Sequence, residues 1–114
     1  MHRQRDILLI PLPFTDLTTA KKRPVLVLSN QCYNSTSDDL IVAAITSNLD
    51  EKPYAVKFGN SDMEEGNLLM ESCIRVDKLY TLSQNIVVKR FGKVSETIFQ
   101  SVRENLIALF DEST

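Results

Sequence analysis

Short runs of β-branched and aliphatic residues, separated by turn-forming residues, fill most of the chain up to Val94. Runs of this length and composition are typical of β-strands. The run LIVAAIT at residues 40–46 is apolar almost throughout, which indicates a strand that is buried on both faces. The pattern predicts six strands, at residues 6–12, 23–29, 40–46, 54–58, 70–76 and 86–94.

The apolar period changes after Ser95. Apolar side chains then follow at positions 98, 99, 102, 106, 109 and 110, which is the spacing of one helix face. Ser95 is a favourable N-cap, and Glu96 suits the positive end of the helix dipole. The spacing predicts a helix over 95–110. Six short strands and one helix indicate a mainly β fold, a small antiparallel barrel with a C-terminal helix, in one domain of residues 1–114.

Composition excludes several classes of protein. No apolar run approaches the roughly 18 residues of a membrane span, and the run at 7–12 is too short for a signal-peptide core. We therefore expect no membrane association and a cytoplasmic location, with Cys32 and Cys73 as reduced thiols. His2 is the only histidine and no Cys-x-x-Cys pair is present, so we expect no metal site and no cofactor.

The formal net charge is −2, but the charges are unevenly distributed. Residues 1–23 carry five basic and two acidic side chains, and residues 75–93 carry five basic side chains and one acidic. Residues 38–65 hold seven acidic and two basic side chains. If the two basic segments meet in space, they form a positive groove on an acidic protein; a solvated surface with chance variation is the alternative.

Candidate chemistry is limited by what the sequence lacks. It has no phosphate-binding loop, no dinucleotide fingerprint and no Gly-x-Ser-x-Gly or His-Glu-x-x-His motif. Catalysis without histidine has to use arginine, lysine, hydroxyl or carboxylate groups. A phosphoryl substrate fits that inventory, because its transition state gains charge on oxygen that a guanidinium can meet with two hydrogen bonds.

Three stretches resemble the MazF/PemK family of toxins from toxin–antitoxin systems. They are DILLIPLPFTDL followed by KKRPVLVLS, then LIVAAITS, then IRVDKLYTL followed by IVVKRFGKVSE, and together they span about residues 5–96. The resemblance implies an SH3-like barrel with a C-terminal helix, the fold shared by MazF and CcdB toxins. It implies a homodimer that is bound by a cognate antitoxin, whose disordered acidic segment makes the contact. It also implies a metal-independent endoribonuclease that cuts single-stranded RNA by attack of the ribose 2′-hydroxyl on the adjacent phosphate.

The resemblance also assigns residues to roles. The catalytic arginine of the family corresponds to Arg23 and its catalytic threonine or serine to Thr46. From the residues alone, a solvated charge at a strand start is the simpler explanation of Arg23, and strand propensity is the simpler explanation of Thr46. The candidate RNA-binding residues are Phe14, Thr15, Asp16, Lys21, Lys22, Ser47, Asn48, Lys78 and Thr81. Phe14 fits equally well as a core residue, and Asp77 is expected to satisfy a turn or pair with a nearby base.

The chain departs from the family pattern at two places. Arg5 stands where relatives often have glycine before the first-strand aspartate, and the loop at 14–22 lacks the glycines of the best-studied branch. Because that loop helps to choose the RNA in the family, the cleavage sequence cannot be inferred. Two other functions stay open: a CcdB-like toxin that binds gyrase without nuclease activity, and a catalytically silent family member.

Overall fold

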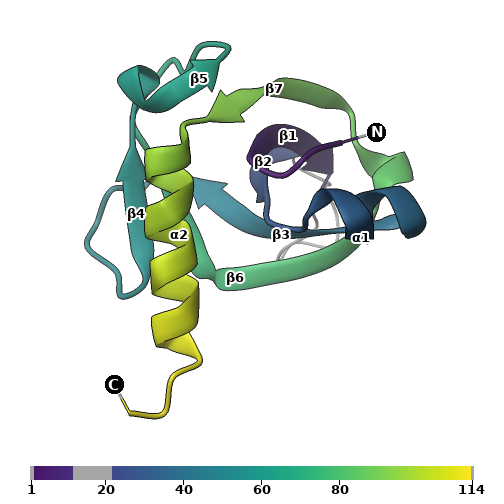
Figure 1. Ribbon diagram of the computed structural model, residues 1–114. Helices are drawn as coiled ribbons and strands as arrows, with labels where there is room; N and C mark the ends of the chain where they lie inside the picture. The colour runs from purple at the N-terminus through teal and green to yellow at the C-terminus, as the bar shows by residue number, and fades with distance from the viewer. Residues whose placement is uncertain (1, 12–21, 114) are drawn as a thin grey trace, which may run out of the picture.

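The computed structural model describes residues 2–11 and 22–113 (Figure 1). Within these ranges, seven strands form one antiparallel sheet in the order β4-β6-β3-β2-β1-β7-β5. The elements in chain order are β1 (Asp6–Pro11), β2 (Lys22–Val27), α1 (Gln31–Thr36), β3 (Asp39–Thr46), β4 (Ala55–Phe58), the 3-10 turn η1 (Asn60–Asp62), β5 (Met63–Glu65), β6 (Ser72–Ser83), the 3-10 turn η2 (Gln84–Ile86), β7 (Lys89–Val94) and α2 (Glu96–Leu109).

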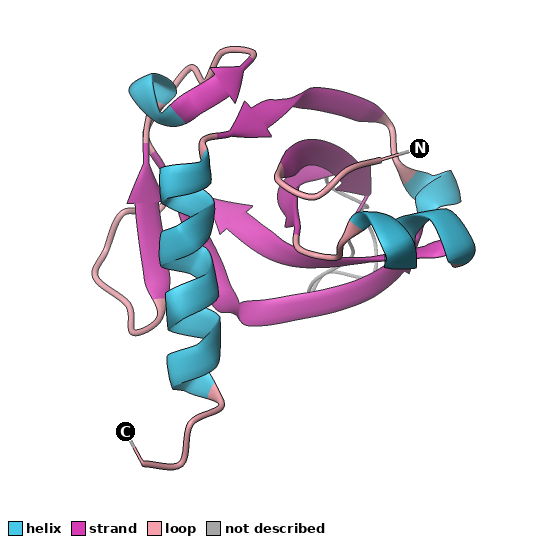
Figure 2. Cartoon of the chain, viewed as in Figure 1, coloured by secondary structure: helices cyan, strands magenta, loops and turns pink. Residues whose placement is uncertain are grey.

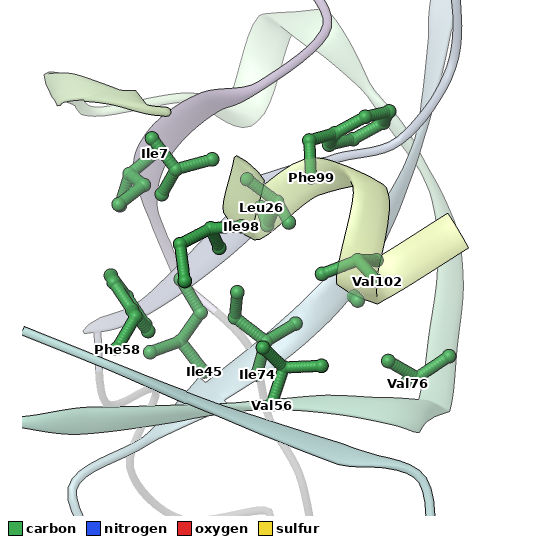
Figure 3. Packing of buried hydrophobic residues seen from close by; sticks show 12 residues of the cluster. Ile7, Leu26, Ile45, Val56, Phe58, Ile74, Val76, Ile98, Phe99 and Val102 are labelled. Atoms are coloured by element: carbon green, nitrogen blue, oxygen red, sulfur yellow. The ribbon is translucent and has the colours of Figure 1, made fainter. Parts of the chain in front are cut away.

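The sheet curls on itself into a half-barrel, and α2 packs across β4 and β6 (Figures 1 and 2). One apolar core lies between the sheet and this helix, and it includes Ile7, Leu26, Ile45 and Ile74 from the sheet and Phe99 from α2 (Figure 3). A second core fills the other face of the sheet, inside the curl, and consists of Leu8, Ile10, Val25, Val27, Leu40 and Val42. Because β1, the second half of β2 and most of β3 are buried on both faces, these stretches are mainly apolar, whereas β2 begins with the exposed Lys22 and Arg23.

β6 contributes to both cores because it contains a bulge. Ala44 of β3 lies opposite Arg75, whereas the preceding Ala43 lies opposite Leu79, so residues 76–78 are extra in β6. An odd number of extra residues reverses which side chains face which side of the sheet. Before the bulge, Ile74 packs under α2; after it, Leu82 and Tyr80 pack inside the curl.

The structure confirms the fold class and the C-terminal helix. The Ser95 hydroxyl caps α2 by accepting a hydrogen bond from the Ile98 N–H at 3.2 Å. Several boundaries predicted from the sequence were wrong. β2 ends at Val27 rather than residue 29, β6 runs from Ser72 to Ser83 rather than from residue 70 to residue 76, and β7 begins at Lys89 rather than residue 86. In addition, β5 was not predicted, and the segment 30–39, expected to be a loop, contains α1.

Polar contacts explain why α1 has no apolar periodicity. The Asn30 side chain caps the helix by accepting from the Tyr33 N–H at 2.9 Å. Asn34, which is buried, accepts from the Ser29 hydroxyl and donates to the Ser29 carbonyl at 2.9 Å. The Gln84 amide donates to the carbonyl oxygens of Asn34 and Ser37 at 2.8 and 3.1 Å, which joins α1 to η2. Such a helix depends on tertiary hydrogen bonds that a hydrophobic pattern does not reveal.

Arg5 has a left-handed backbone conformation, with φ of +79°. Its N–H donates to the Val27 carbonyl at 3.0 Å and its carbonyl accepts from the Val94 N–H at 3.1 Å, so it joins the ends of two strands. Its guanidinium donates to Glu64 Oε1 and to the Val94 carbonyl, both at 3.1 Å. This conformation suits glycine better than other residues, since a Cβ atom is strained there.

We predict that Arg5→Gly is more stable than Arg5→Ala, by about 1 kcal/mol, because both variants lose the guanidinium contacts and only glycine relieves the backbone strain. Urea denaturation of both variants measures the difference. Lys57, exposed in the regular strand β4, is the control position. There the order should reverse, with Lys57→Ala the more stable variant. Equal midpoints for the two Arg5 variants would contradict the strain argument.

Candidate functional site

A cavity of about 260 Å³ opens where β2 begins and β3 ends. Lys22 and Arg23 line it from the start of β2, and Thr46 and Ser47 line it from the end of β3. Two of these side chains are cationic and two carry hydroxyl groups. These are the groups that proteins use to hold phosphate oxygens.

The pairing of β2 with β3 brings Arg23 close to Thr46. Val27 lies opposite Val42 and Val25 opposite Ala44. Arg23 and Thr46 each lie two residues beyond the last of these pairs, at the same end of the two strands, and both line the cavity. Both residues belong to strands rather than to a loop. A site on paired strands is more rigidly positioned than one on a loop.

The turn after β3 orients the Thr46 hydroxyl. Thr46 Oγ1 accepts a hydrogen bond from the Asn48 N–H at 3.1 Å, and Asn48 Oδ1 accepts from the Asp50 N–H at 2.9 Å. A hydroxyl oxygen that accepts a bond keeps its own proton for donation. Thr46 is half-buried, whereas Ser47 and Asn48 are exposed. The hydroxyl of Thr46 can therefore donate to an oxygen atom bound in the cavity.

The remaining predicted site residues are distributed differently. Phe14, Thr15, Asp16 and Lys21 lie outside the described residues. Asn48 contacts Thr46 but does not line the cavity. Lys78 lies in the β6 bulge and Thr81 pairs with Ile41, which is five residues, or roughly 16 Å, from Thr46 along β3. Lys78 and Thr81, both exposed, are thus not brought to the cavity.

Much of the basic charge of residues 75–93 is met by carboxylates. Arg75 donates to both oxygens of Asp77, at 2.9 and 2.8 Å, as expected for Asp77; this pairing lowers the pKa of the Asp77 carboxyl. Three further ion pairs join Arg90 to buried Asp6 at 3.1 Å, Arg90 to Glu65 at 2.9 Å and Lys93 to Glu64 at 3.6 Å. The acidic segment 38–65 therefore contacts the basic segment 75–93 through Glu64 and Glu65. The cationic side chains that line the cavity, Lys22 and Arg23, come from β2 instead.

Sequence reasoning missed the apolar part of the cavity. Leu69, Met70 and Phe91 line it with their side chains 99%, 63% and 39% exposed. The sequence interpretation placed Met70 at the start of one strand and Phe91 within another. A usable signal was the run Leu-Leu-Met after Gly66-Asn67, because three apolar residues beside a turn are too few for a core strand.

Among residues 2–11 and 22–113, no helix is long and apolar enough to cross a membrane. No group of three or more histidine, cysteine, aspartate or glutamate side chains there is arranged to hold a metal ion. Cys32 is exposed and Cys73 is buried, and both are free thiols.

The chain is similar to proteins of a known family. Residues 3–110 match the family model described as PemK-like, MazF-like toxin of type II toxin–antitoxin system. No curated protein matches the chain at a significant level.

Solved structures with a similar fold include several toxins. An endoribonuclease in complex with its cognate antitoxin, from a mycobacterial species, superposes with a TM-score of 0.77 at 18% identity, covering 95% of this chain and 93% of that one. The Mycobacterium tuberculosis toxin MazF-mt6 has a TM-score of 0.75 at 21% identity, covering 94% and 97%. A MazE–MazF structure from Deinococcus radiodurans has a TM-score of 0.72 at 17% identity, covering 95% and 93%. At these identities the likeness establishes the fold.

Proposed function

The chain belongs to the PemK-like, MazF-like family of toxins of type II toxin–antitoxin systems, and on this premise we propose that it is an endoribonuclease that cleaves single-stranded RNA. The observation that carries the proposal is that Arg23, from the start of β2, and Thr46, from the end of the neighbouring strand β3, line one cavity together with Lys22 and Ser47. This arrangement supplies fixed charge and a hydroxyl proton at one point. The related endoribonucleases of known structure support the same activity.

In the proposed reaction, the ribose 2′-oxygen attacks the adjacent phosphorus. A new 2′-O–P bond forms while the P–O5′ bond breaks, which leaves a cyclic phosphate and a 5′-hydroxyl. The 2′-hydroxyl proton leaves to solvent, and the 5′-oxygen acquires a proton. The Arg23 guanidinium meets the negative charge that grows on the non-bridging oxygens, and Thr46, oriented by the Asn48 N–H, donates to one of them.

The binding partners and location follow the same proposal. Lys22 and Lys21 contact flanking phosphates, together with the other groups of the loop at 14–22. A cognate antitoxin covers the cavity with a disordered acidic segment that folds on binding, as charge complementarity with Lys22 and Arg23 favours. RNA and antitoxin meet the toxin in the cytoplasm. Structures of related toxins in complex with antitoxins support the partner class.

We predict that cleavage of a long RNA persists in excess EDTA, because guanidinium and hydroxyl groups need no metal to stabilise the transition state. Gel analysis of a purified transcript with and without chelator measures this. Loss of cleavage in EDTA, restored by magnesium or manganese, would contradict the proposed site. Absence of cleavage under both conditions would favour the CcdB-like or catalytically silent alternative.

We predict that Arg23→Ala lowers the single-turnover cleavage rate about 100- to 1,000-fold, with little change in melting temperature because Arg23 is exposed. Arg23→Lys should rescue only in part, since an ammonium lacks the planar two-donor fork. Thr46→Val keeps the β-branched shape and removes the hydroxyl, so it should also slow cleavage.

Lys22→Ala is the matched control for the removal of a neighbouring cation. It should weaken RNA binding and flatten its salt dependence while the rate at saturating enzyme stays close to that of the parent. If Arg23→Ala cuts as fast as the parent, or loses activity only in parallel with stability, Arg23 has a structural role and the reaction takes place elsewhere.

We predict a homodimer, because β4 and β5 end the sheet as short edge strands that pairing or packing with a second copy would cover. Light scattering at micromolar concentration should give about twice the 12.9 kDa chain mass. A monomer at all concentrations tested would contradict this prediction.

A further inference from the structure

Three exposed apolar side chains stand beside the phosphate-binding groups of the cavity. Leu69 and Met70 come from the segment between β5 and β6, and Phe91 comes from β7. We call these three residues the apolar shelf. Neighbouring Leu68 packs against the core under α2, whereas Leu69 is 99% exposed. Exposed apolar groups that cluster at a cavity mark a binding surface.

A bulge in β7 turns Phe91 out of the sheet. Ile7 lies opposite Gly92 and Leu8 lies opposite Arg90, which leaves Phe91 without a partner in β1. Bulges next to functional sites commonly re-aim a side chain in this way. Phe91 therefore lines the cavity although it belongs to a strand.

Two glycines hold the bulge where β5 ends beside β7. A Cβ atom on Gly92 would lie 2.2 Å from the Glu65 carbonyl oxygen, and one on Gly66 would lie 2.3 Å from the Phe91 carbonyl oxygen. The two backbones thus approach more closely than other residues allow. The Arg90–Glu65 ion pair spans the same crossing. The Phe91 backbone is held in place before any ligand binds.

Polar groups around the shelf indicate what it binds. The Lys89 ammonium lies 5.3 Å from the centre of the Phe91 ring, and Lys22 and Arg23 line the same cavity. Asn67, which is exposed and also lines the cavity, carries an amide that can donate and accept hydrogen bonds. A flat ring with cations and an amide nearby is the combination that proteins use to hold an unstacked base of single-stranded RNA.

We infer that the apolar shelf binds one nucleobase next to the phosphate that is cut, by stacking on Phe91 and packing against Leu69 and Met70, with Asn67 reading the edge of the base. The inference rests on the proposed function and names the part of the site that selects the RNA. An acidic antitoxin segment would use the same cations, but it has no base edge for the Asn67 amide to read. RNA supplies phosphate charge and a flat base together, and it is therefore the occupant that the shelf and its neighbouring polar groups favour.

The test is a double-mutant cycle in which the Phe91 ring is removed from the protein and one base is removed from the RNA. The probe is a short RNA taken from a site that the protein cuts in a long transcript or, if it cuts none, from a random pool that it retains on a filter. Its scissile ribose carries a 2′-O-methyl group, which prevents attack. Matched probes lack the base on one side or the other of that phosphate. Fluorescence anisotropy measures the binding of each probe.

Phe91→Ala should weaken binding of the complete probe about 5- to 150-fold, the range expected for loss of one stacked base. For the abasic probe that lacks the stacked base, Phe91→Ala should bind as well as the parent protein does, because the ring then has no base to contact. Phe91→Trp should restore binding. Leu69→Ser should weaken binding without affecting folding, since Leu69 is 99% exposed. Phe110→Ala, which removes an exposed phenyl ring outside this cavity, should bind like the parent.

Equal weakening of complete and abasic probes by Phe91→Ala, or no weakening at all, would overturn the inference. If Phe91→Ala and Leu69→Ser leave RNA binding intact and lose only inhibition by an antitoxin, the shelf is a peptide-binding surface. Cleavage of the unmodified RNA separates the two proposals. If the probes bind with the expected differences but the unmodified RNA is not cut, the nuclease is refuted and the shelf stands. If Phe91→Ala cuts RNA as fast as the parent at enzyme concentrations below saturation, the shelf is refuted. A protein that does not bind RNA refutes both.

Discussion

A sheet that has only one long helix to cover it has to bury most of its remaining apolar surface against itself. In this chain the three-residue bulge of β6 makes that possible, because it lets one strand face the helix-covered core with Ile74 and the enclosed core with Leu82. Without the bulge, side chains would alternate regularly along β6, and the apolar residues on one side of the bulge would then face away from their core. β3 pairs with β6 on one side and with β2 on the other, and Thr46 at the end of β3 lines the same cavity as Arg23 at the start of β2.

A second bulge interrupts the regular strand pairing between β1 and β7. There the bulge at Phe91, the glycines at the β5–β7 crossing and the ion pair of buried Asp6 with Arg90 occur within a few residues. Burial of a carboxylate is costly unless it is paired, and Asp6 also accepts from the Arg3 N–H at 2.9 Å. This end of the sheet is therefore tightly constrained, and its constraint coincides with the wall of the cavity that carries the apolar shelf.

The chemistry proposed for the cavity suits what this sequence contains. With His2 the only histidine, a guanidinium and a hydroxyl on paired strands are the groups that the fold brings to one point. Charge that appeared segregated along the chain is largely neutralised in space, since Glu64 and Glu65 of the acidic segment pair with Arg5, Arg90 and Lys93. The positive character of the cavity then depends on a few residues of β2 rather than on a broad basic groove.

Local patterns were sufficient for the mainly β class, the long helix with its Ser95 cap, and the strand ends that carry Arg23 and Thr46, because periodicity and capping are properties of neighbouring residues. The length of β6, helix α1 and the cavity position of Phe91 could not be predicted in this way. A bulge depends on the partner strand, α1 is joined to η2 by the Gln84 side chain, and Phe91 is turned outward by a backbone crossing with β5. Each of these features results from contacts between residues far apart in the chain, and such contacts exist only once the chain has folded.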